Sequence, residues 1–333
     1  MSAKQKTQET TSYKPYSWQA ILEFRAMWVV LALGLVLPFV ISKPLATEIM
    51  VYALFALAFN LLLGHTGIIS FGHAGYLGAG AYAGAMVVYY GGVGVWVSLL
   101  AAMAGGTLVA VLIGLLAVKR KGAYFAMISL AIAQMLYFLA LSPFKRWTDG
   151  EDSLKLPPLS VDFPFHIDLS DQLSLYYFVF VIVALAVLAQ WRILSSPFGH
   201  ALKGIRENED RIRACGFDIT RIKFLSIIYS GLFSGLAGGL LAIYLGAASI
   251  TILFWMTSGI VVMQTVLGGT HTFMGPFIGT AVFLYLRNNI SNYTDRWEMW
   301  VGAMFMALIL LFPEGIWGTI VQKIGERRRP SAS

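Results

Sequence analysis

Long apolar runs separated by short polar stretches make up most of the chain. The runs cover residues 27–41, 46–63, 74–90, 94–118, 122–141, 174–194, 224–246, 250–268, 275–288 and 298–312. They are continuous rather than alternating, which favours membrane helices over the strands of a β-barrel. We therefore expect an all-α, polytopic helical membrane protein with about ten membrane segments. The range is eight to ten, because glycines interrupt the chain near 60–75 and 268–276.

The polar stretches give the domain organisation and the orientation. We expect a cytoplasmic tail over 1–26, a transmembrane domain over 27–317 and a basic tail over 318–333. If the N-terminus is cytoplasmic and all ten runs span, 18 of the 24 Lys and Arg residues face the inside. This bias predicts that both termini are cytoplasmic. It also makes 142–173 an outer, turn-rich loop without a helix, and 195–223 a cytoplasmic loop.

Composition narrows the class of protein. Hydrophobic residues make up 58% of the chain and charged residues 12%, about half the ~25% that is usual for soluble domains. This excludes an ordinary soluble enzyme and a disordered chain. Cys215 is the single cysteine, so no intramolecular disulfide can form. The net charge of +7 is explained by the positive-inside bias, so we expect membrane lipid and no nucleic acid as a partner.

The first interrupted segment, near 60–75, is called the first break. Glycine is a poor helix former, so the glycines here predict a helix break that exposes polar groups to a translocation pathway. The candidate pathway residues are Asn60, Gly64, His65, Thr66, Gly67, Ser70, Gly72 and His73. Alternatively, the glycines only permit tight helix packing, above all Gly75, Gly80 and Gly84. A metal site is not favoured, because neither Cys nor carboxylate lies near the two histidines.

The second interrupted segment, near 268–276, is called the second break. It repeats the composition of the first, and its candidate pathway residues are Gly268, Gly269 and His271. Interrupted segments in both halves of a chain are typical of transporters built from repeats. A tight cytoplasmic turn between two helices explains the same residues equally well.

The loop 195–223 carries charges of both signs. Pro197 can begin a helix and Gly216 can end one, with Ala201, Ile205, Ile212 and Cys215 partly lining one side. Such a short amphipathic helix suits insertion into a groove of a soluble partner. A solvated loop is the alternative.

Ionisable groups inside the membrane usually mark ion or proton pathways. We expect no Asp or Glu within a clear span, and this argues against a carrier driven by an ion gradient. A stand-alone secondary carrier or channel is nevertheless the alternative function. An intramembrane enzyme built on Ser70 and His73 is less favoured, because no third orienting group is evident.

Four motifs, taken in order, resemble those of the LivM-type permeases of ATP-driven importers for branched-chain amino acids. The motifs cover Asn60–Gly75, Thr148–Gly150, Ser196–Asp210 and Phe312–Gly318, so that the resemblance extends from about 45 to 320. The chain departs from the family pattern at Lys145-Arg146-Trp147 and at Thr270-His271-Thr272. These departures affect the identity of the solute more than the fold. Related permeases take urea, short amides or aromatic acids.

The resemblance implies a permease subunit of the bacterial inner membrane without ATPase activity. Its partners would be a second, LivH-like permease, two cytoplasmic ATPases and a periplasmic solute-binding protein. The subunit would hold no cofactor, since ATP and Mg²⁺ bind to the ATPases. Residues 197–216 would be the loop that couples to the ATPases, with Glu209, Asp210, Ala214 and Gly216 holding the register and Arg206 at the rim. Pro197 and Gly199 belong to the same coupling set.

Overall fold

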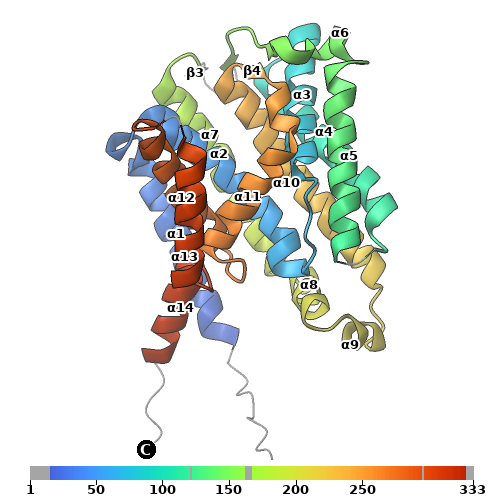
Figure 1. Ribbon diagram of the computed structural model, residues 1–333, viewed down its shortest axis with the longest axis vertical. Helices are drawn as coiled ribbons and strands as arrows, with labels where there is room; N and C mark the ends of the chain where they lie inside the picture. The colour runs from blue at the N-terminus through green and yellow to red at the C-terminus, as the bar shows by residue number, and fades with distance from the viewer. Residues whose placement is uncertain (1–15, 121, 162–166, 295, 328–333) are drawn as a thin grey trace, which may run out of the picture.

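The computed structural model describes residues 16–120, 122–161, 167–294 and 296–327, and it is almost entirely helical (Figure 1). The helices are α1 (Tyr16–Val40), α2 (Lys43–Asn60), the π-helix η1 (Leu61–Thr66), α3 (His73–Gly91), α4 (Val95–Ala117), α5 (Ala123–Leu141), α6 (Lys145–Thr148), η2 (Gly150–Asp152), α7 (Gln172–Leu194), α8 (Pro197–Glu207), α9 (Glu209–Ala214), α10 (Ile219–Leu245), η3 (Ile250–Leu253), α11 (Trp255–Gly268), α12 (Gly275–Ser291), α13 (Trp297–Leu311) and α14 (Ile316–Arg327). Two short antiparallel pairs complete the fold, β1 (Leu154–Lys155) with β4 (Ala247–Ala248) and β2 (Ser160–Val161) with β3 (Ile167–Asp168).

Each predicted apolar run coincides with a helix. Within the described residues, seven helical stretches are long and apolar enough to cross a membrane, and they do not include α3, α11 or α12. These three helices correspond to the predicted runs 74–90, 250–268 and 275–288. An interior helix packs against protein rather than lipid, so it can be short or rich in glycine. The all-α membrane class follows, and the total of ten spans stays a prediction.

Helices α3, α4 and α10 form the centre of the packing. Gly80 of α3 faces Gly235 of α10 so closely that a Cβ at Gly80 would lie 2.5 Å from the Gly235 Cα atom. Small residues allow this approach of two backbones. The glycines of α3 beyond the first break therefore serve helix packing.

The polar loops lie at opposite ends of the molecule (Figure 1). One end carries α6 and the short strands, and the other carries α8, α9 and the end of α14. The loop 142–173 is turn-rich as predicted, but it also contains two short helical turns, α6 and η2. The Thr148 hydroxyl donates to the Ala140 carbonyl at 2.6 Å, which fixes α6 to the end of α5.

Helix α1 begins at Tyr16, and the domain boundary at 26/27 stays a prediction. Two other predictions are corrected by the structure. Glu23 and Glu48 lie within spanning stretches, so the expectation of no carboxylate in a span was wrong. Glu48 accepts from the Arg287 guanidinium of α12 at 2.6 Å. Pairing with an opposite charge makes a carboxylate tolerable at this depth.

The second correction concerns residues 197–216, which form two helices instead of one. Helix α8 ends at Glu207, and Asn208 has extended backbone angles. The Asn208 side chain then caps α9 by accepting from the Arg211 amide at 3.0 Å. Asparagine is favoured at this position because its oxygen satisfies an otherwise unpaired amide.

Candidate coupling site between the two breaks

The first break continues α2 as a π-turn. The His65 Nδ1 atom lies 3.2 Å from the Asn60 carbonyl, and the Thr66 hydroxyl donates to the Leu61 carbonyl at 3.0 Å. Gly67 ends the turn with a φ of +76°, a left-handed conformation that glycine adopts without steric cost. The chain therefore leaves the helix here, after a turn in which two side chains contact nearby carbonyls.

The second break is held by other parts of the chain. The Asn60 amide Nδ2 donates to the Thr272 carbonyl at 3.0 Å. Gly315, from the predicted 312–318 motif, lies against Gly268 and Gly269, so that a Cβ there would lie 2.5 Å from the Gly269 Cα atom. The two breaks, more than 190 residues apart in sequence, thus lie side by side.

Arg206 of α8 joins the two breaks. Its Nη1 atom donates to the Gly64 carbonyl, and its Nη2 atom lies 3.3 Å from His271 Nε2. Its aliphatic stem packs on Gly67, where a Cβ would lie 3.2 Å from the Arg206 Cγ atom. One side chain of the predicted coupling loop therefore holds groups of both breaks.

Burial lowers the pKa of both groups in this contact, Arg206 and His271. Desolvation lowers the pKa of the Arg206 guanidinium. The pKa of His271 is also lowered, first by desolvation and then by the Arg206 charge, while Glu314 opposes the shift. His271 is therefore neutral near pH 7, and its Nε2 atom accepts from the guanidinium.

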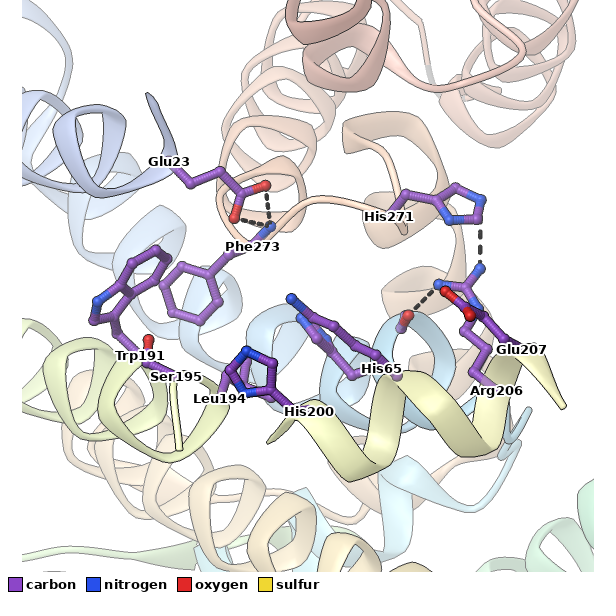
Figure 2. Close-up of a pocket in the computed structure, with 12 residues that line it drawn as sticks. Glu23, His65, Trp191, Leu194, Ser195, His200, Arg206, Glu207, His271 and Phe273 are labelled. Atoms are coloured by element: carbon purple, nitrogen blue, oxygen red, sulfur yellow. Dashed lines mark hydrogen bonds between the residues drawn. The ribbon is translucent and has the colours of Figure 1, made fainter. Parts of the chain in front are cut away.

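A cavity of about 550 Å³ lies beside this contact. Figure 2 shows Glu23, Trp191 and Phe273 on one side and Arg206 with His271 on the other. Four predicted residues line it: Gly64, His65, Arg206 and His271. Other lining residues were not predicted from the sequence, among them Glu23, Trp191, Lys203 and Phe273.

The remaining pathway candidates lie elsewhere. The candidates that do not line this cavity are Asn60, Thr66, Gly67, Ser70, Gly72, His73, Gly268 and Gly269. His73 Nε2 lies 2.9 Å from the Ser230 hydroxyl, which itself donates to the Ala58 carbonyl. The His73 ring also packs edge-to-face on Phe59. His73 thus joins helices in the core, and its hydroxyl partner is Ser230 rather than Ser70.

The predicted coupling residues form two sets, one that points into the permease and one that is exposed. Arg206 points into the permease instead of to an outer rim, and Glu209 pairs with Lys223 at the start of α10. Asp210, Ala214 and Gly216 are exposed on and after α9. Pro197 occupies the first turn of α8 and buried Gly199 packs on Leu194. The exposed set is available to a partner, whereas the inward set anchors the loop.

No group of three or more His, Cys, Asp or Glu side chains that could hold a metal ion occurs among the residues described by the structure. The functional features are instead apolar membrane-crossing helices, two interrupted segments and an amphipathic loop that contacts both. These features define a polytopic membrane transport component. Residues 43–313 match the family described as branched-chain amino acid transport system, permease component. The chain belongs to this family.

Known relatives agree over most of the chain. It is 25% identical to the high-affinity branched-chain amino acid transport system permease protein LivM of Salmonella typhimurium, covering 87% of this chain and 74% of the relative. Escherichia coli LivM is also 25% identical, covering 86% and 73%. The guanosine ABC transporter permease NupQ of Bacillus subtilis is 27% identical, covering 53% and 59%. The chain is a permease subunit of an ABC importer.

Proposed function

We propose that this chain forms half of a membrane pathway for branched-chain amino acids or similar small solutes in the bacterial inner membrane. Its partners in the proposal are a second, LivH-like permease, two cytoplasmic ATPases that bind ATP and Mg²⁺, and a periplasmic solute-binding protein. The solute is inferred from the LivM relatives, which match 86–87% of the chain, whereas the guanosine permease matches 53%.

The contact of Arg206 with both breaks is the observation that carries this proposal. Helix α8 begins at Pro197 and presents Arg206 near its end, while α9 exposes Asp210 and Ala214. A partner that moves α9 would move α8 with it, because Ile212 of α9 packs on Gly204 of α8. Arg206 would then shift the Gly64 carbonyl and His271 together. ATP-driven motion outside the membrane thereby reaches both interrupted segments.

Uptake by the reconstituted complex tests the proposal. Proteoliposomes that contain both permeases and both ATPases should take up radiolabelled leucine when ATP and the binding protein are supplied. A complex with ATPases that cannot hydrolyse ATP is the control, and it should show no uptake. Gradient-driven leucine uptake by the permeases without ATPases would contradict the proposal and favour a secondary carrier or channel.

A further inference from the structure

The cavity at the α8 end of the molecule has two chemically different sides. On one side, the Glu23 carboxylate accepts from the Phe273 amide at 3.2 Å through each oxygen. A carboxylate has about four acceptor positions, so each oxygen can still accept from a ligand. Trp191 packs edge-to-face on Phe273 with ring centroids 5.1 Å apart. This side thus combines one carboxylate with an aromatic wall.

The opposite side of the cavity carries two cations, Lys203 and Arg206, and the carboxylate of Glu207 lies beside Arg206. Lys203 and Arg206 lie four and seven residues after Gly199 on α8, and both line the cavity. Lys203 also interacts electrostatically with Glu23. The Lys203 ammonium group and the Glu23 carboxylate therefore belong to the same cavity. In Figure 2 the Arg206 and Glu23 side chains approach the cavity from opposite sides.

We propose that this cavity binds a free zwitterionic α-amino acid with an aliphatic side chain. The ligand carboxylate would pair with Lys203 and Arg206, its ammonium group with Glu23, and its side chain would pack on Trp191, Phe273 and Leu194. A zwitterion supplies both charges and leaves the local charge balanced. The volume of about 550 Å³ is within the ~300–1,000 Å³ usual for small-molecule sites. This inference rests on the proposed function, because it concerns the same solute class.

Occupancy of the cavity has a consequence for coupling. A ligand carboxylate would compete with the Gly64 carbonyl and His271 for the Arg206 guanidinium. Because Arg206 joins α8 to both breaks, the bound amino acid weakens that connection. The site therefore lets the solute that accumulates at this end slow its own import.

Equilibrium binding of radiolabelled leucine to the purified importer complex, without the binding protein, tests the proposal. Two analogues separate the charges: 4-methylpentanoate lacks the ammonium group, and 3-methylbutylamine lacks the carboxylate. We expect Glu23→Gln to weaken leucine binding about tenfold and to leave 4-methylpentanoate binding unchanged. Lys203→Gln should weaken leucine and 4-methylpentanoate binding and leave 3-methylbutylamine binding unchanged.

Two matched variants control for general effects of charge removal. Glu151→Gln and Lys155→Gln change exposed residues near the opposite end and should leave all three affinities unchanged. Absence of saturable leucine binding, or equal loss of all three ligands in both cavity variants, would overturn the inference. If Glu23→Gln prevents folding, the Lys203→Gln comparison decides alone. ATP-driven leucine uptake without such binding would refute only this site, whereas failure of leucine uptake would refute the proposed function.

Discussion

The two glycine-rich breaks have similar compositions but are stabilised in different ways. The first break begins with the π-turn η1, in which the His65 and Thr66 side chains each contact a carbonyl five residues earlier in the chain. The second break takes its contacts from distant parts of the chain, namely Asn60, Glu23 and Gly315. The π-turn is therefore shaped by local side-chain contacts. The rest of the first break, where the Phe71 amide donates to Ser129 Oγ, and the second break depend on tertiary packing. Arg206 of α8 contacts groups of both breaks.

This difference indicates which break moves more readily. A segment held by a few long-range contacts can change position when those contacts are lost, whereas a locally bonded turn keeps its shape. We therefore expect the second break to respond to motion of α8 and the first to act as its fixed support. The following variants test this assignment.

Gly268→Ala should have the largest effect. A Cβ at Gly268 would overlap the backbone of Gly275 and lie 3.0 Å from the Gly279 amide nitrogen, and backbone cannot move aside as a flexible side chain can. We expect a loss of about 3 kcal/mol in the free energy of unfolding, measured by unfolding in mixed detergent.

Two other glycine variants make this result specific. Gly67→Ala in the first break should cost about 1 kcal/mol, because its left-handed backbone is strained for alanine while its neighbour, the Arg206 stem, can shift. Gly259→Ala in α11 meets no atom within 4 Å and should leave stability unchanged or raise it by up to about 1 kcal/mol. Equal losses in all three variants would contradict the distinction between the breaks.

Asn60→Ala should have the next largest effect. It removes the donor to the Thr272 carbonyl, a buried contact between the breaks. An unsatisfied buried carbonyl costs about 2 kcal/mol, so the free energy of unfolding should fall by that amount. Asn289→Ala is the control, since its side chain donates to the Tyr285 carbonyl of its own helix in an exposed hydrogen bond. If both variants lost the same stability, the contact between the breaks would be energetically unimportant.

Arg206→Gln should uncouple transport while leaving the fold intact. Loss of the charge-assisted bonds to Gly64 and His271 should lower ATP-driven uptake about tenfold, with ATP hydrolysis retained. Arg206→Lys should recover only part of the activity, because an ammonium group lacks the planar fork that reaches both acceptors. Arg192→Gln, at the exposed end of α7, should transport normally. Uptake by Arg206→Gln at the normal rate would exclude this residue from coupling.

The sequence predicted the features that depend on local chemistry. Continuous apolar runs gave the helices, and the glycines near 60–75 and 268–276 located both breaks. Pro197 and Gly216 marked the limits of the amphipathic loop. The division of that loop at Asn208 was missed, because asparagine is tolerated within a helix and only the observed cap shows that it begins a new one.

Long-range contacts could not be predicted from a single chain. The pairing of Glu48 with Arg287 joins residues 239 positions apart, and the contact of Asn60 with Thr272 spans 212. The pattern of apolar and polar residues along the chain does not indicate which distant residues pair. The inward direction of Arg206 was missed for the same reason, since a charge on an amphipathic helix is usually solvated. Glu23 was assigned to the tail because the apolar run begins only after it.

The smallest expected effect concerns the pH dependence of the second break. Burial and the Arg206 charge lower the pKa of His271 below its ordinary value of 6.5, so the unfolded chain binds a proton at a higher pH than the folded chain does. The stability from neutral His271 is fully present above pH 6.5 and declines as the pH falls toward the lowered pKa. We expect His271→Gln to reduce the fall in Tm between pH 7.5 and pH 5.5. Arg206→Gln should reduce it less, because burial is the larger cause. An unchanged pH dependence in His271→Gln would show that protonation of another group weakens the fold first.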